Sequence, residues 1–163
     1  MFYNFSYSYK RGAIWVQART PYDSLSMLPL DTILKENNTF YVARDKKWYD
    51  ILPFNDSPAL FAMSERVKCL LEDNHVTGWS CFPIVIENSN VTYYAFQVLL
   101  TAGEILNLQA VNDHITEHIE FDITTWDGSE VFTLQGTGLH VCTERVKLLL
   151  EKAKVTNLEF EPL

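Results

Sequence analysis

The feature that most constrains this chain is a stretch of 21 residues that occurs twice. Residues 64–84 read SERVKCLLEDNHVTGWSCFPI, and residues 143–163 read TERVKLLLEKAKVTNLEFEPL. Aligned without gaps, ten of the 21 positions are identical. Self-similarity of this kind indicates two copies of one supersecondary unit. The fold must therefore place the same succession of elements twice.

Each copy predicts a short amphipathic helix that begins after a hydroxyl residue. Ser64 and Thr143 are suited to accept hydrogen bonds as N-caps, and valine and leucine then recur at the i, i+3, i+4 spacing of one buried helix face. Arg66 and Arg145 lie in the first turn, where the helix dipole disfavours a cation. We therefore expect each arginine to pair with a carboxylate elsewhere in the fold.

A turn and a strand should follow each helix. The helices are expected to end near Asn74 and Ala153. Gly78 and Asn157 then hold equivalent positions, and glycine and asparagine are the residues that most readily adopt a positive φ. We predict a left-handed turn residue shared by both copies, followed by a strand that carries a matched proline and so lies at an edge or a strand end.

The residues before each helix predict further strands. Residues 39–52 hold two β-rich runs around a charged turn, and residues 118–134 alternate in polarity before the hairpin signal Asp127-Gly128. We predict an α+β fold over a single domain of residues 1–163. Two similar β-β-α-β units, at about residues 39–84 and 116–163, would share one core of mostly antiparallel sheet. The aromatic run at the start is expected to add a strand, and residues 29–38 a short helix.

Charge is distributed unevenly along the chain. The formal net charge is −8, and residues 82–163 account for all of it with four basic and twelve acidic side chains. No lysine or arginine lies between Lys68 and Arg145. Nucleic acid and anionic membranes are therefore poor partners, because binding to either needs a cationic surface. A basic protein would be attracted, unless the charge only keeps the protein monodisperse.

The first residues, the cysteines and two histidines of the chain bear on its compartment and on metal binding. The opening MFYNFSYSYKRG does not predict a secretory signal, and no run approaches the roughly 20 apolar residues of a spanning helix. Three cysteines without CxxC spacing fit reduced thiols in a cytoplasm. His114 and His118 could hold zinc on a helix, but on the predicted strand they lie about 13 Å apart. We expect no cofactor, no metal and no enzymatic activity.

The repeated motif resembles a known family. The pattern E-R-V-K-x-L-L-E, followed by V-T-G and a closing proline, is similar to immunity proteins of bacterial polymorphic toxin systems. Such chains end in a helix and T-G-x-x-F-x-P-[LIV], which residues 156–163 match except that Asn157 replaces the glycine. The resemblance covers about residues 40–163. It implies a cytoplasmic protein that binds a toxin domain and blocks it, and it supplies no catalytic residues.

The hairpin region is the predicted toxin-binding surface. Its candidate residues are Glu117, Glu120, Asp122, Trp126, Asp127 and Glu130. Trp126 would either stand exposed as an apolar anchor among the acidic side chains or fold back onto the sheet. The alternative function is a regulatory domain that binds a small molecule or peptide between the two repeats, and a third is an enzyme with dispersed acidic residues. The oligomeric state stays open.

Overall fold

The computed structural model describes residues 1–21, 38–109 and 119–163. The elements up to the first helix are β1 (Phe2–Ser6), β2 (Trp15–Ala18), β3 (Thr39–Arg44), β4 (Ile51–Phe54), β5 (Ser57–Ser64) and α2 (Glu65–Asp73). They are followed by β6 (Trp79–Ile86), β7 (Tyr93–Val98), β8 (Thr101–Ala102), β9 (Glu104–Ile105), β10 (Phe121–Asp122), a 3-10 turn η1 (Ile123–Thr125), β11 (Val131–Leu134), β12 (His140–Thr143), α4 (Glu144–Lys152) and β13 (Glu159–Pro162). The helix predicted at residues 29–38 lies almost wholly outside the described residues.

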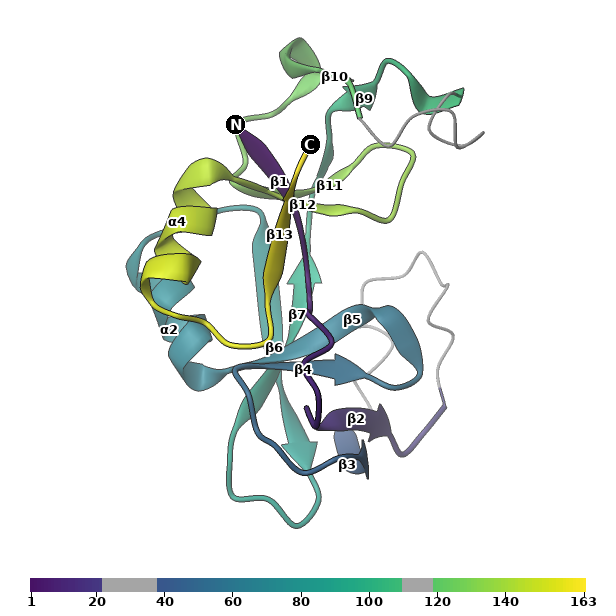
Figure 1. Ribbon diagram of the computed structural model, residues 1–163, viewed down its shortest axis with the longest axis vertical. Coiled ribbons are helices and arrows are strands. Elements are labelled where there is room, and N and C mark those ends of the chain that lie inside the picture. Colours follow the sequence, from purple (N-terminus) through teal and green to yellow (C-terminus); the bar gives the residue numbers. More distant parts are fainter. Residues whose placement is uncertain (22–37, 110–118) are drawn as a thin grey trace.

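The strands form a closed barrel, a five-stranded sheet and a small two-stranded sheet. The barrel runs β2-β3-β6-β7-β5-β4, and the sheet runs β13-β1-β12-β11-β8. β9 and β10 pair separately, at the end of the molecule opposite the β2–β3 corner of the barrel (Figure 1). Most pairings are antiparallel, so the predicted α+β class and mostly antiparallel sheet are confirmed. The closed barrel was not predicted.

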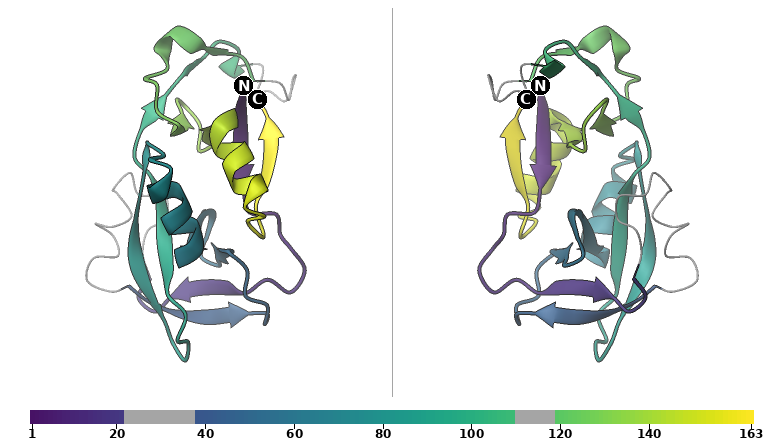
Figure 2. Two further views of the ribbon diagram at one scale, coloured as in Figure 1. Left: turned by 90° about the vertical axis from the view of Figure 1, so that its left-hand side faces the viewer. Right: turned by 90° about the vertical axis from the view of Figure 1, so that its right-hand side faces the viewer.

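The barrel and the sheets do not reproduce the predicted layout of two β-β-α-β units; below, "first unit" denotes β4, β5, α2, β6 and β7, and "second unit" denotes β11, β12, α4, β13 and β1. The first unit has the strand order β4-β5-β7-β6 and the second has β11-β12-β1-β13. Within them Tyr94 of β7 pairs with Met63, and Tyr3 of β1 pairs with the equivalent residue Cys142. β1 is therefore an integral strand of the second unit, supplied from the start of the chain. Figure 2 shows β1 and β13 side by side.

The predicted hairpin at residues 118–134 is wrong. β10 pairs with β9, whereas β11 pairs with β12 and β8. Between them, Asp122 Oδ1 accepts hydrogen bonds from the backbone N–H and the hydroxyl of Thr124, at 2.9 and 2.7 Å. Such local side-chain bonds compete with strand pairing, and here they start η1. The runs within residues 39–52 do form strands, but β3 and β4 pair with other strands of the barrel rather than with each other.

The helices α2 and α4 lie on one side of the molecule, where both contribute to a common core (Figure 2). Val67 and Leu71 of α2 and Val146 and Leu150 of α4 are buried there, as the spacing predicts. Ser64 caps α2 by accepting from the Val67 N–H. Thr143 makes no such bond, and its hydroxyl is buried without a partner among the described residues.

Aromatic rings fill the junction between the units. Phe5 of the second unit packs edge-on against Phe96 of the first at 5.9 Å, and Phe96 stacks on Phe61 at 5.0 Å. The residue equivalent to Phe61 is His140, whose ring lies 5.9 Å from that of Phe5. Desolvation by burial lowers the pKa of His140 to about 4, so its imidazole is neutral at pH 7.

The predicted left-handed turn is confirmed in both copies. Gly78 has φ +92° and Asn157 has φ +63°. A Cβ on Gly78 would lie 1.8 Å from the carbonyl oxygen of Val131, so the second unit's backbone passes directly against it. Asn157 instead uses its side chain, donating to the carbonyl of Ile51 and accepting from the N–H of Lys10. The turn at Gly78 thus contacts the other unit by close backbone packing, whereas the turn at Asn157 contacts it through side-chain hydrogen bonds.

Candidate functional site

The first-turn arginines join the two units reciprocally. Arg66 pairs with Asp50 at 2.6 Å and donates to the carbonyl of Ala153 at 2.9 Å, at the end of the other unit's helix. Burial would raise the pKa of Asp50, but hydrogen bonds from Arg66, Thr156 and Ser64 outweigh it and hold that pKa below its usual value. The carboxylate is therefore ionised and fully engaged in the fold.

Arg145 repeats this arrangement in the opposite direction. It pairs with Glu130 and donates to the carbonyl of Asn74 at 2.7 Å. Both arginines thus satisfy carbonyls that the last turn of a helix leaves free, and both pair with carboxylates as the sequence predicts. Glu130, a predicted toxin-binding residue, is occupied in this structural role.

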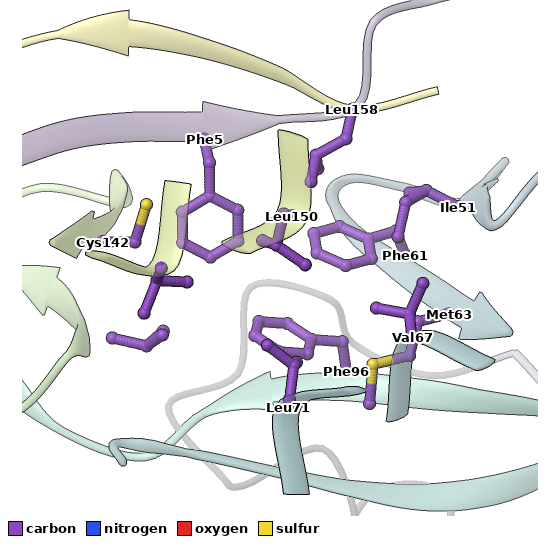
Figure 3. Close-up of a pocket in the computed structure, with 12 residues that line it drawn as sticks. Phe5, Ile51, Phe61, Met63, Val67, Leu71, Phe96, Cys142, Leu150 and Leu158 are labelled. Carbon is purple, nitrogen blue, oxygen red and sulfur yellow. The ribbon is translucent and has the colours of Figure 1, made fainter. Parts of the chain in front are cut away.

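The space between the units is almost filled by apolar side chains. Figure 3 shows Phe5, Phe61 and Phe96 meeting Leu71 and Leu150 from the two helices. The cavity that remains is about 20 Å³ and has no polar lining, which is room for about one water molecule. This cavity is too small for a small molecule or peptide, and a separate pocket of about 120 Å³ lies beside Phe5, Phe61 and His140.

The end of the molecule that carries β9 and β10 is acidic and partly apolar. We call this surface the acidic end, and it consists of Glu104, Leu106, Glu120, Asp122, Ile123 and Asp127. Leu106 is 66% exposed and Ile123 is 52% exposed. Within the described parts of the chain, its four carboxylates form no salt bridge with a lysine or arginine.

Two carboxylates of the acidic end face each other. Glu104 of β9 and Asp122 of β10 are direct partners in the antiparallel register, and like charges in that position destabilise a strand pair. Hydrogen bonds from Thr124 lower the pKa of Asp122. The pKa of Asp127 is likewise lowered, by hydrogen bonds from Ser129. Asp122 and Asp127 therefore carry negative charge at pH 7.

The structure brings three of the predicted site residues, Glu120, Asp122 and Asp127, to the acidic end, while Glu117 lies outside the described residues. Trp126 takes the second of its two predicted positions, because it folds back and its ring lies 5.1 Å from that of Phe2. Its indole N–H donates to the Ser129 carbonyl at 2.9 Å. It is half-buried and does not form the exposed anchor.

The exposed apolar residues of the acidic end were missed from the sequence. Ile123 alternates with polar neighbours in the sequence, which predicts the inward face of a strand, but it lies in η1 and is exposed. Leu106 follows a two-residue strand and has no periodic pattern around it. No sequence signal distinguished either of them from a core residue.

The predictions about a metal site and a membrane-spanning helix can be compared with the structure only for the described residues. His114 and His118 lie outside that part of the chain. Within residues 1–21, 38–109 and 119–163, no three His, Cys, Asp or Glu side chains are placed to hold a metal ion. The same residues include no helix that is long and apolar enough to cross a membrane.

Comparison with known proteins gives no relative from which a site could be transferred. No protein-family model matches the chain, and no curated protein has a significantly similar sequence.

Proposed function

We propose that this chain is a cytoplasmic immunity protein that binds a basic toxin domain one-to-one through its acidic end and neutralises it without catalysis. The observation that carries the proposal is the acidic end itself. Its four carboxylates form no salt bridge with a lysine or arginine of the described residues, and two exposed apolar side chains, Leu106 and Ile123, lie at the same end. The repeated motif adds the resemblance to immunity proteins.

Charge and apolar area have separate parts in the proposed interface. The apolar side chains of the acidic end provide the desolvated centre that holds most interface energy. The carboxylates accelerate the encounter with a basic partner and disfavour an acidic one. The repulsion between Glu104 and Asp122 would be relieved when a cationic side chain of the toxin lies between them.

A binding role fits the carboxyl groups better than proton transfer does. A catalytic acid at neutral pH needs a raised carboxyl pKa, which burial in an apolar pocket provides. In the described parts of the chain, the carboxyl groups with shifted pKa values are Asp50, Glu87, Asp122 and Asp127, and each pKa is shifted downward because the group accepts hydrogen bonds from an arginine or a hydroxyl residue. They are held as anions, which suits electrostatic recognition.

The proposal is tested by affinity purification of the tagged protein from its native cells. We expect one basic protein at equal stoichiometry, released by high salt. The double variant Glu104→Lys/Glu120→Lys should lose it. The matched control Glu65→Lys/Asp73→Lys makes the same charge change at exposed positions on α2, where its effects on the helix dipole are opposite in sign.

The outcome must also show neutralisation. The captured partner should be toxic when it is expressed alone and harmless when it is co-expressed with the wild-type chain. A partner that is not toxic would contradict the immunity function, even if it binds the acidic end. Equal loss of binding in both double variants would contradict the proposed surface.

A further inference from the structure

A pocket lies beside the junction of the two units, at the point where β1 and β12 separate. The ladder between these strands ends at Asn4 and Val141. The next facing residues, Phe5 and His140, no longer form a ladder pair, although β1 stays paired with β13 as far as Ser6. The opening that this separation leaves has a volume of about 120 Å³, which is about four times the volume of one water molecule in the liquid.

The first unit closes the corresponding opening with two aromatic rings. There Phe61 and Phe96 hold the positions of His140 and Phe5, just beyond the end of the ladder between β5 and β7. Their rings stack at 5.0 Å with an interplanar angle of 10°. In the second unit the rings of Phe5 and His140 lie 5.9 Å apart and are tilted by 39°. The pocket therefore occurs in the unit that has an imidazole in place of a phenyl ring.

His140 brings a polar ring without a partner to this pocket. Its side chain lies on the same face of β12 as that of Cys142, toward the ring of Phe5. In the described parts of the chain, no residue forms a hydrogen bond or an ion pair with the imidazole. Because burial lowers its pKa to about 4, the ring is neutral at pH 7, with one donor and one acceptor nitrogen. A desolvated polar group of this kind costs free energy until a ligand or water satisfies it.

The lining of the pocket restricts what can bind there. The described residues that line it include no lysine, arginine, aspartate or glutamate, so a charged ligand would lose its hydration without gaining a counter-charge. The rings of Phe5 and Phe61 provide apolar area, and polar atoms line the pocket beside them. A cavity of about 150 Å³ in another protein holds a benzene ring. A neutral ring that carries an O–H or N–H group therefore matches the pocket in size, charge and hydrogen bonding.

We propose that this pocket binds a small neutral aromatic molecule with one hydrogen-bond donor, of the phenol or indole class. The donor bonds to the acceptor nitrogen of His140, and the ring packs against Phe5 and Phe61. Because these two phenylalanines belong to different units, the ligand bridges the units and stabilises the fold by mass action. The pocket is separate from the acidic end, and this site does not depend on the toxin proposal.

Binding is followed through the imidazole nitrogen resonances of the isotope-labelled protein. Phenol and indole are the probes, and benzene, benzoate and benzylamine are controls that lack the donor or carry a charge. We expect phenol or indole to shift the ring nitrogens of His140 and to leave those of the exposed His75 unchanged. Benzene should bind at least about threefold more weakly, because it leaves the imidazole without a partner. The two charged compounds should cause no shift.

The variant His140→Phe puts the first unit's residue into the pocket. It should weaken binding of the probe at least about tenfold, because it removes the acceptor and fills the opening. The probe should also raise the urea midpoint of the wild type but not that of His140→Phe. If His140→Phe does not fold, His140→Leu removes the acceptor in its place. Probes that leave the His140 nitrogens unmoved, that bind the variant equally or that bind no better than benzene would overturn the proposal, and the pocket would then hold only water.

Discussion

Among the six possible glycine-to-alanine substitutions, Gly78→Ala should destabilise the protein most. The residue has φ +92°, where an L side chain costs about 1–2 kcal/mol. The new Cβ would also lie 1.8 Å from the Val131 carbonyl oxygen, so the backbone of β11 must move. Overpacking of this kind adds about 1–3 kcal/mol. We expect a loss of about 2–5 kcal/mol, a large part of the stability of a typical domain.

Urea unfolding of Gly78→Ala and Gly128→Ala separates the two contributions. Gly128 has φ +87°, but a Cβ there meets nothing within 4 Å, so only the conformational cost applies. Gly78→Ala should therefore be the less stable variant by at least about 1 kcal/mol at an unchanged m-value. Equal losses in the two variants would refute the argument that the turn of the first unit is packed against the second.

Four further predictions concern residues of the repeat and their partners. Ser64→Ala should lower the free energy of unfolding by about 1 kcal/mol because it removes a cap. Thr143→Val should be neutral or stabilising by the same urea assay, because that hydroxyl has no partner among the described residues. Asp50→Asn should cost about 2–3 kcal/mol, since Arg66 loses its anionic partner. His140 is neutral in the fold with a pKa of about 4, below its unfolded value. Stability should fall by up to about 3 kcal/mol as pH drops from about 6.5 to about 4. His140→Phe should remove that dependence, and an unchanged pH profile of the urea midpoint would contradict it.

The helices and turns could be predicted because their signals are local. Capping residues, the i, i+4 spacing and the pair Gly78 and Asn157 each act within a few residues of the element they specify. The arginine pairs were predicted in kind for the same reason, since an unfavourable charge in a first turn needs a partner. The second partners of the two arginines, the carbonyls at the end of the opposite helix, follow from how the units pack and have no local signal.

The exchange of strands between the ends of the chain was harder to predict. β1 and β7 hold equivalent places, and their sequences FYNFS and YYAFQV share an aromatic-tyrosine-x-phenylalanine pattern. That similarity was visible in the sequence. It was missed because β7 follows the first unit's helix whereas β1 precedes its own by more than a hundred residues, so the order of elements along the chain conceals the repeat.

The negative charge of the acidic end was predicted from the sequence, but the apolar residues that it exposes were not. Glu120, Asp122 and Asp127 are exposed or partly exposed as expected, because a segment without lysine or arginine stays acidic in any fold. The apolar contribution was assigned to Trp126, which is instead held by Phe2 from the start of the chain. A contact between residues so distant in sequence is decided by tertiary packing, and it moves the apolar part of the surface to Leu106 and Ile123.

The central claim is that the acidic end binds a basic toxin domain, and affinity measured with the purified partner tests it most directly. Titration calorimetry would compare wild type, Glu104→Lys/Glu120→Lys and Glu65→Lys/Asp73→Lys. We predict a one-to-one complex that the acidic-end variant weakens at least about a hundredfold and the control variant changes less than about threefold. Equal affinities for all three proteins would contradict the claim.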